Sequence, residues 1–139
     1  MYEEYSRQAL PSKRYRELLG SAICVFNSNN QFIIENILRI DRLSYNWYEL
    51  IDKTSGQLSE PIKETITKNS DTKIAKLFSS IIGKRNRIIH SFQITEDNDQ
   101  ILRTKTKKHE QYTITESYLL EFIKDNENLS SMLHNFRGH

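Results

Sequence analysis

The feature that most constrains the fold is a stripe of apolar residues that recurs in steps of three and four between Ser12 and Ile51. This spacing is the period of one helix face, so it predicts a single long helix or two helices with a tight break. Ser12 directly follows Pro11 and is a favoured N-cap, while Gly56 lies just past the segment as a stop signal. The polar run 27–30 interrupts the stripe, and we expect it to mark a kink or a buried polar contact.

Three further helices and one extended segment are expected after this stripe. A short helix should cover Ser59–Asn69, and a longer one should begin at Asp71 as its N-cap and continue to about Ser91. The capping box Thr113-x-x-Glu116 opens the last helix. Between the last two helices the sequence alternates weakly, which predicts a short β-hairpin or an extended loop over Gln93–Thr113.

These segments together predict an all-α fold. We expect a four-helix, up-and-down bundle with a small extended or β-hairpin insertion before the last helix, at residues 93–114, and an N-terminal arm at residues 1–11. The acidic run Glu96-Asp97-Asn98-Asp99 should form the turn before the hairpin. A length of 139 residues suits one domain, so a single domain is expected over residues 1–139.

Composition argues against several classes of protein. No apolar run approaches the ~20 residues that a membrane span requires, and the first residues lack the basic-then-apolar layout of a signal peptide. We therefore expect a cytoplasmic protein that does not associate with membranes. Cys24 is the only cysteine, so one chain has neither a disulfide framework nor a cysteine-based zinc site. The apolar neighbours of Cys24 favour a small core residue over a reactive thiol.

The sequence predicts neither a cofactor nor a bound metal. It contains no phosphate-binding glycine loop, no zinc-protease helix motif and no calcium-binding loop. His134 and His139, five residues apart near the C-terminus, are a poor metal pair. The net charge of +2 is too small to argue for nucleic acid by itself, so any basic patch must be local.

One constellation of residues carries chemistry, late in the helix expected over 71–91. Asn86 and His90 are four residues apart and point to nearly the same side of a helix. Arg85 lies ~140° from His90, but its side chain is long enough to reach a shared phosphate. An arginine on an apolar stripe is costly unless it meets an anion or a carboxylate. Arginine binds phosphate oxygens and imidazole transfers protons near neutral pH, so this trio suits a phosphodiester reaction.

A structural role for the same residues is the alternative. Arg85 would then cap a helix end or pair with Glu35 or Asp41, and His90 would be a buried imidazole whose hydrogen bonds are satisfied. Glu35 is also a candidate for the carboxylate that orients His90. The spacing alone does not decide between the two interpretations.

The hexapeptide Arg85-Asn86-Arg87-Ile88-Ile89-His90 resembles the motif of the HEPN superfamily. In that motif an arginine, usually followed by a polar residue, precedes a histidine by four to six intervening residues. Four residues intervene here, and asparagine follows the arginine, which is the commonest form. The motif also has its position in the family, late in a helix that follows one or two long helices. The resemblance implies one HEPN-like helical bundle over residues 1–139.

The resemblance also implies a function. HEPN proteins are typically homodimers in which two copies of the motif face one cleft, and many are metal-independent endoribonucleases of toxin–antitoxin, phage-defence and CRISPR-linked systems. By position, Arg85 would bind the scissile phosphate, and His90 would take the proton of the ribose 2′-hydroxyl or protonate the leaving 5′-oxygen. Asn86 would orient His90 or the phosphate. The expected partners are RNA, a second copy of the chain, and an antitoxin or nucleotidyltransferase-like protein.

Two other functions remain open beside the ribonuclease. One is a non-catalytic HEPN-like module that binds RNA, a nucleotide or a protein partner through the same cleft. The other is a dimerisation adaptor in which Arg85 is only a member of an ion pair.

Further cations are candidates for RNA binding. One precedes the motif, one lies within it, and four lie in the extended segment, where His109 follows them: Lys84, Arg87, Arg103, Lys105, Lys107 and Lys108. The cations at alternating positions would follow an RNA backbone and give salt-dependent binding. The alternative is an exposed edge strand whose lysines prevent aggregation.

Two further sets of polar residues lie in the first predicted helix. Asn27, Asn29 and Asn30 are candidates for lining the cleft opposite the motif, although such a run more often marks a helix irregularity. The three cations at the start of the first helix are interpreted as a solvated face: Lys13, Arg14 and Arg16.

Overall fold

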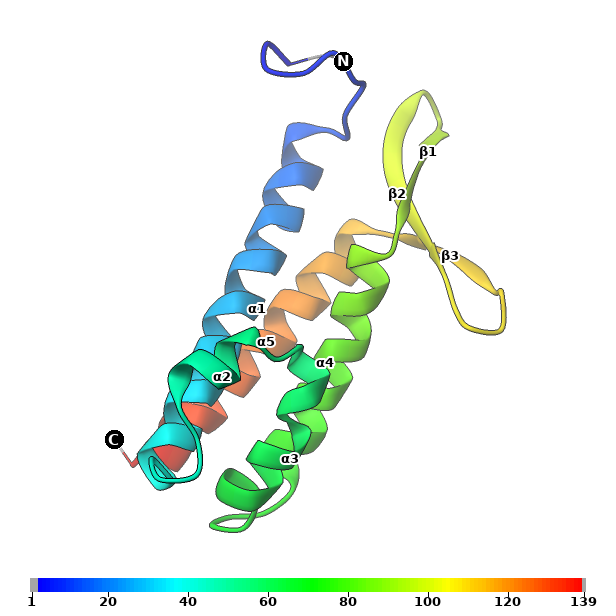
Figure 1. Ribbon diagram of the computed structural model, residues 1–139. Coiled ribbons are helices and arrows are strands. Elements are labelled where there is room, and N and C mark those ends of the chain that lie inside the picture. The colour runs from blue at the N-terminus through cyan, green and yellow to red at the C-terminus, as the bar shows by residue number, and fades with distance from the viewer. Residues whose placement is uncertain (1–2, 139) are drawn as a thin grey trace.

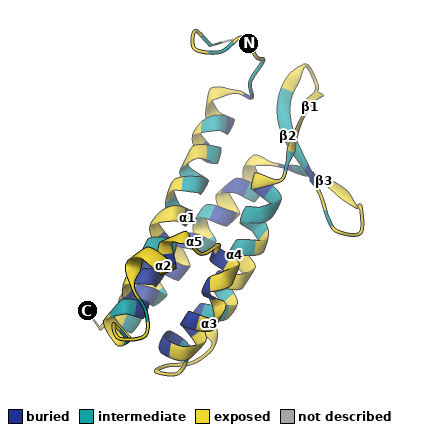
Figure 2. Ribbon diagram, viewed as in Figure 1, coloured by how far each residue is buried: buried dark blue, intermediate teal, exposed yellow. Residues whose placement is uncertain are grey.

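The structure is a computed structural model that describes residues 3–138. Its three long helices are α1 (Lys13–Ile40), α4 (Lys73–Ile89) and α5 (Glu116–Arg137), and both α1 and α4 pack against α5 (Figure 1). Short helical segments join α1 to α4, and three strands join α4 to α5. Buried residues line the inward faces of the helices (Figure 2). Within residues 3–138, no helix combines the length and the apolar character needed to cross a membrane.

The predicted apolar stripe is divided between two helices with a break. α1 begins at its predicted cap, because the hydroxyl of Ser12 accepts the N–H of Tyr15 at 3.2 Å. At the other end of α1, the carboxylate of Asp41 accepts two N–H groups of the following residues and closes a turn. The side chain of Asn46 then caps a new helix, α2 (Trp47–Asp52). The sequence therefore encodes the break through two short polar side chains.

The predicted short helix over residues 59–69 is a composite of three segments. A 3₁₀ turn, η1 (Ser55–Leu58), leads into α3 (Ser59–Ile62) and then into a π-helical turn, η2 (Lys63–Thr67). The hydroxyl of Thr65 donates to the backbone oxygen of Pro61 at 2.6 Å, so a side chain competes for a carbonyl in the widened turn. These segments still contribute buried residues to the core: Leu58, Ile62 and Ile66.

One aromatic residue from each long helix meets at the centre of the core. The ring of Phe26 on α1 stacks on Phe78 of α4 at 6.1 Å and on Phe122 of α5 at 6.4 Å between centroids. All three side chains are at most 2% exposed. Buried aromatic pairs at this separation add about 0.5–1.5 kcal/mol beyond the burial of their area. This cluster fixes the relative position of the three helices.

The prediction of an all-α, four-helix bundle is wrong. Residues 3–138 contain five α-helices, two of them short, together with three strands: β1 (Phe92–Glu96), β2 (Asp99–Lys105) and β3 (Gln111–Ile114). The strands form an antiparallel sheet in the order β1-β2-β3. The residues predicted as an insertion form a packed part of the fold, because Thr104 of β2 and Ile114 of β3 are fully buried.

The register of the sheet shows how the alternating sequence is used. Leu102 pairs with Ile114, and Thr104 pairs with Tyr112, so these four side chains share one face. Thr104 and Ile114 on this face are 0% exposed. The phenol of Tyr15 donates to the backbone oxygen of Ile114 at 2.6 Å and accepts the N–H of Leu102 at 3.3 Å. The start of α1 is thereby fastened to β2 and β3.

The predicted acidic turn has a different place in the hairpin, and the cap of α5 lies two residues after the predicted Thr113. Asp97 and Asn98 both have positive φ, 51° and 68°, which makes them a two-residue turn within the β1–β2 hairpin, whereas the sequence predicted a turn before a hairpin. Thr115 caps α5 by accepting the N–H of Tyr118, whereas the predicted cap, Thr113, lies in β3. A threonine hydroxyl therefore caps α5 as predicted, but from a position two residues later.

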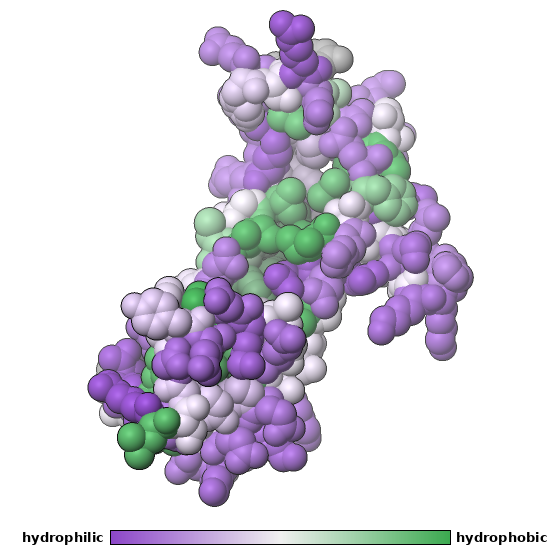
Figure 3. All heavy atoms as spheres, viewed as in Figure 1, coloured by the Kyte–Doolittle hydropathy of each residue, from purple (hydrophilic) through white to green (hydrophobic). Residues whose placement is uncertain are grey.

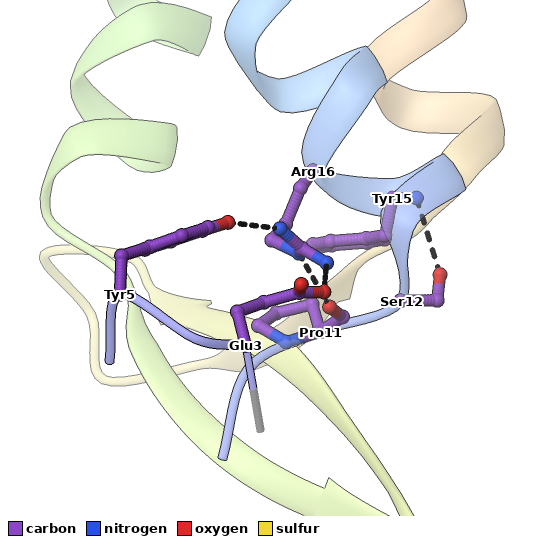
Figure 4. A network of polar contacts seen from close by, with 6 residues as sticks. All are labelled: Glu3, Tyr5, Pro11, Ser12, Tyr15 and Arg16. Carbon is purple, nitrogen blue, oxygen red and sulfur yellow. Dashed lines mark hydrogen bonds and ion pairs between the residues drawn. The ribbon is translucent and has the colours of Figure 1, made fainter. Parts of the chain in front are cut away.

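The N-terminal arm is fastened by Arg16 (Figure 4). Its guanidinium donates to the backbone oxygen of Pro11 at 2.8 Å, to the hydroxyl of Tyr5 at 2.7 Å and to Oε1 of Glu3 at 2.5 Å. The side chain is 25% exposed, so the prediction that Arg16 belongs to a solvated face is wrong. Because one planar cation binds three groups of the arm, it holds residues 3–11 against the start of α1.

Candidate functional site

The motif residues lie at the C-terminal end of α4, where the chain enters the sheet. Arg85 and Asn86 are within the helix, whereas His90 is its C-cap, with φ −96° and ψ 36°. The backbone N–H of His90 donates to the backbone oxygen of Asn86 at 2.9 Å. The His90 side chain is exposed, and its imidazole makes no hydrogen bond within residues 3–138. The interpretation of His90 as a buried, satisfied imidazole is therefore wrong.

The guanidinium of Arg85 lies against the aromatic core. Its Cζ is 4.9 Å from the centroid of the Phe26 ring, and Phe26 is 2% exposed. One terminal N–H donates to Oδ1 of Asn86 at 3.0 Å, so Asn86 orients the arginine and not the histidine. The Nε of Arg85 is buried and has no hydrogen-bond partner. Buried polar atoms are nearly always hydrogen-bonded, so this unpaired donor shows that the protein satisfies the Arg85 guanidinium only in part.

No carboxylate neutralises Arg85. Within the described part of the chain, no Asp or Glu oxygen lies within 4.0 Å of its guanidinium. Glu35 lies nine residues beyond Phe26, which places it ~14 Å further along α1. Asp41 instead closes the turn after that helix. The ion-pair interpretation of Arg85 is therefore wrong, and the positive charge is available to a ligand.

The surface around Arg85 is apolar. Ile82 and Ile89 lie three residues before and four residues after Arg85, on the same face of α4. Ile82 is half-buried and Ile89 is 52% exposed. On α1, half-buried Leu19 lies two turns from Phe26 on the same helix face. Figure 3 shows an apolar area in the middle of this face, between two polar ends. Exposed apolar surface beside an unneutralised cation indicates a binding surface.

Lys84, which precedes the motif, and Arg87, which lies within it, both have structural partners. The Nζ of Lys84 lies 2.7 Å from Oδ2 of Asp125 on α5, and their side chains are 31% and 24% exposed. Arg87 donates to the backbone oxygen of Lys105 on β2. Next to them, burial raises the pKa of Tyr118, whose phenol therefore stays protonated. Lys84 holds α4 against α5 and Arg87 holds it against the sheet, so RNA binding would compete with these contacts.

The lysines of the extended segment are exposed but do not lie on an edge strand. Lys105 ends β2, and Lys107 and Lys108 lie in the turn that leads to β3. β2 is the central strand of the sheet, so the explanation that these lysines protect an exposed edge is wrong. The cations remain candidates for contacts with an RNA backbone, on a turn that projects from the sheet.

Arg103 on β2 lies opposite a residue that closely follows the motif. It pairs across the sheet with Phe92, which is two residues after His90. One terminal N–H of Arg103 approaches the hydroxyl of Thr113 at 3.4 Å, and its Nε is buried without a hydrogen-bond partner. Like Arg85, it has no carboxylate within 4.0 Å among residues 3–138. The end of α4 and the start of the sheet therefore carry two unneutralised guanidinium groups.

The asparagine run in α1 has structural partners. Asn29 is 5% exposed, and its Nδ2 donates to the backbone oxygen and to Oδ1 of Asn126 on α5 at 2.7 and 3.0 Å. Asn30 accepts the hydroxyl of Ser55 at 2.8 Å. Asn27 is exposed. The predicted buried polar contact is therefore present at Asn29, which faces α5, and the interpretation of this residue as lining a cleft opposite the motif is wrong.

Cysteine and histidine chemistry is sparse. Cys24 is exposed, so its prediction as a core residue is wrong. It is two residues from buried Ala22 and two from buried Phe26, and residues two apart point to opposite sides of a helix. His134 packs against the ring of Phe32 at 4.6 Å, and His139 lies outside the described residues. Within residues 3–138, no three His, Cys, Asp or Glu side chains are grouped to hold a metal ion.

No protein-family model, no curated protein and no solved structure matches the chain.

Phe26 is the contact that sequence reasoning missed. Its position on the apolar stripe predicts a core residue, which it is, but nothing in the sequence indicates that Arg85 lies over its ring. Only the packing of α1 and α4 against α5 brings the two side chains together.

Proposed function

We propose that the protein is a metal-independent endoribonuclease that acts as a homodimer. The observation that supports this most strongly is Arg85, a half-buried cation over Phe26 with an unpaired Nε and no carboxylate partner. Keeping such a charge in an apolar surface is unfavourable unless an anion binds it. A phosphodiester is the anion that the neighbouring imidazole suits, because cleaving RNA requires proton transfer as well as charge stabilisation.

In the proposed reaction RNA supplies its own nucleophile. The ribose 2′-oxygen attacks the adjacent phosphorus, the bond from phosphorus to the 5′-oxygen breaks, and the products carry a 2′,3′-cyclic phosphate and a 5′-hydroxyl. His90 takes the proton from the 2′-hydroxyl or gives one to the leaving 5′-oxygen. Arg85 binds the non-bridging phosphate oxygens, whose charge increases in the transition state. Asn86 keeps Arg85 in position through its hydrogen bond.

The homodimer supplies what one chain lacks. The reaction needs a base and an acid, and His90 is the single histidine of the motif in each chain. A two-fold dimer across the apolar surface near Ile89 would bring two motifs to one cleft and bury that surface. We place the reaction in the cytoplasm, with an antitoxin or nucleotidyltransferase-like protein as a partner. The setting in phage defence or a toxin–antitoxin pair comes from the HEPN resemblance alone.

The decisive experiment is RNA cleavage in the presence of EDTA. Wild-type protein, His90→Asn and the matched control His109→Asn are incubated with a mixed RNA. His109 is also exposed, and its φ of 70° is one that asparagine tolerates. We expect wild type and His109→Asn to leave 2′,3′-cyclic phosphate ends and His90→Asn to lose activity by at least ~100-fold. Equal cleavage by all three proteins would exclude the mechanism.

A mixing experiment tests the shared cleft. His90→Asn is expected to be inactive, and a mixture of wild type with excess His90→Asn that has exchanged subunits forms mainly heterodimers with one intact motif. If the acid and the base come from different chains, these heterodimers are inactive, because their cleft lacks one histidine, and the activity falls as they form. If one chain supplies a complete site, the intact chain of each heterodimer keeps its activity, so the total activity stays that of the wild type added. Size-exclusion chromatography with light scattering checks that both proteins remain dimers.

One observation favours a second function, a non-catalytic module that binds RNA through the same surface. The imidazole of His90 contacts neither Arg85 nor Asn86 within a single chain, so a ligand could be held by Arg85 without proton transfer. In that case wild-type protein would not cleave RNA, and His90→Asn would bind RNA as tightly as wild type. Arg85→Met would still lose affinity.

A further inference from the structure

A second group of cations lies at the opposite end of the bundle from the motif. Arg39 is in the last turn of α1, Arg42 follows that helix, and Arg137 ends α5. Figure 1 shows these two helix ends side by side at the lower left. The three arginines line one cavity of about 320 Å³, and an adjoining cavity of about 340 Å³ shares Arg39 and Arg137. Two discontinuous segments of the chain therefore bring three guanidinium groups to one hollow.

The charges of this hollow are not balanced by the protein. Within residues 3–138, none of the three arginines has a carboxylate oxygen within 4.0 Å. Glu35 is the one acidic residue that lines the first cavity, so its three cations and one anion give a net charge of +2. This equals the formal charge of the whole chain. The local excess is therefore a property of this site and not of a generally basic surface.

The floor of the hollow is ordered. The Cζ of Arg137 lies 5.9 Å from the centroid of the Phe32 ring, whose other neighbour is the ring of His134. Asn36 lines both cavities and is 1% exposed. Its Nδ2 donates one hydrogen to the backbone oxygen of Phe32 at 2.9 Å, which leaves a second hydrogen without a partner. A buried amide with an unused donor accompanies the three cations.

Helix dipoles account for only part of this arrangement. A cation in the last turn of a helix is stabilised by the partial negative charge there, which explains Arg39 and Arg137 taken singly. It does not explain why the two helix ends and Arg42 converge on one cavity, or why Asn36 is buried beneath them. We propose that this hollow binds a phosphate monoester. A monoester carries −1.5 to −2 charges at neutral pH, which matches the net charge of the site, whereas a phosphodiester carries one.

The inference does not rest on the proposed ribonuclease. Arg39 lies 13 residues beyond Phe26 on α1, so ~20 Å of helix separates the hollow from the motif. Two ligands carry such a phosphate monoester: the 5′-phosphate end of an RNA and a free mononucleotide. Planar guanidinium groups bind such oxygens through paired N–H donors.

The test compares ligands that differ only in the phosphate. Titration calorimetry measures the affinity of the protein for AMP against adenosine, and for a 5′-phosphorylated against a 5′-hydroxyl 2′-O-methyl oligonucleotide. The methylated sugars have no nucleophile, so the result is independent of cleavage. We expect the phosphorylated ligand of at least one pair to bind at least tenfold more tightly. Binding of AMP identifies the mononucleotide as the source, and binding of the oligonucleotide alone identifies the RNA end.

Charge-changing variants locate the site. Arg39→Gln/Arg137→Gln should lower the affinity for the phosphorylated ligand by about tenfold or more, to that of the unphosphorylated one. Glu35→Gln should raise it. The control Arg14→Gln/Lys124→Gln removes the same net charge from exposed positions elsewhere on α1 and α5 and should leave it within about twofold. Circular dichroism confirms that each variant is folded. Equal affinity for both members of each pair, or an Arg39→Gln/Arg137→Gln variant that binds like wild type, overturns the proposal.

Discussion

The substitution Arg85→Met distinguishes a cation that binds a ligand from a cation that stabilises the fold. Methionine keeps an unbranched chain of similar reach, so the packing over the Phe26 ring is retained while the charge and the donors are removed. Removing an arginine from a buried ion pair would lower the free energy of unfolding by about 3–5 kcal/mol. The contacts of Arg85 predict a much smaller effect.

The magnitude follows from the contacts of Arg85. The cation–π contact with Phe26 at 4.9 Å is worth about 1 kcal/mol for a half-buried pair, and the hydrogen bond to Asn86 at 3.0 Å about 1 kcal/mol. Both are lost in the variant. Against this, the buried Nε without a partner costs about 1–3 kcal/mol in the wild type, and the variant no longer carries that cost. The contributions nearly cancel, so we expect the free energy of unfolding to change by less than about 1 kcal/mol.

Urea unfolding followed by far-ultraviolet circular dichroism measures this difference, at one fixed protein concentration because a dimer is stabilised by its own concentration. Arg16→Met is the matched control, since Arg16 has three partners and its loss should cost about 1–2 kcal/mol. RNA cleavage or binding is measured on the same samples and should be lost in Arg85→Met. If Arg85→Met loses more than about 2 kcal/mol, or keeps its activity towards RNA, the reasoning is refuted.

Three further predictions concern the packing and the RNA path. Asn29→Leu should lower the free energy of unfolding by about 1–3 kcal/mol because it leaves Oδ1 of buried Asn126 without its donor, and the double variant Asn29→Leu/Asn126→Leu should cost less than the sum; additive effects in the urea cycle would show that the pair is not coupled. Tyr15→Phe should cost about 1–2 kcal/mol by releasing α1 from the sheet. Burial raises the pKa of Tyr15 above its usual 10.0, so wild-type stability, complete below that pH, should decline at higher pH, and urea midpoints across alkaline pH should fall less steeply for Tyr15→Phe. Lys107→Gln/Lys108→Gln should reduce the slope of log affinity against log salt by about 0.7 per lysine in filter binding with single-stranded RNA, and an unchanged slope would remove these lysines from the RNA path.

The helices were predictable because their signals are local. Ser12 caps α1 by its own hydroxyl, and the spacing of apolar residues after Ser12 predicted the buried face of α1. The same kind of signal misplaced Cys24, because apolar neighbours in sequence do not share a helix face. The apolar spacing allows a break in the stripe, but the position of the break depends on Asp41, whose side chain competes with the helix only once the turn has formed.

The sequence predicted a short β-hairpin or an extended loop, and not a three-stranded sheet, for a physical reason. Its strands have four to seven residues and weak alternation, so their pattern resembles that of a polar loop. What makes them strands is long-range: Leu102 and Ile114 become neighbours, and both are fastened to Tyr15 on a helix that begins far earlier in the chain. A contact of this kind leaves no trace in a short window of sequence, and neither does the position of Arg85 over Phe26.

The two principal residues of the motif differ in how firmly the fold holds them, and this difference has a consequence for catalysis. Arg85 is fixed by the aromatic core and by Asn86, so a bound phosphate would find its cation already oriented. His90 sits one residue past the end of α4, exposed and without a side-chain hydrogen bond among residues 3–138, so nothing in one chain fixes its imidazole. Proton transfer requires hydrogen-bond distance to the reacting oxygen. In the proposed ribonuclease, a chain on its own would therefore bind phosphate better than it cleaves RNA, and ordering of His90 by RNA or by a second copy would be the step that makes the bound complex reactive.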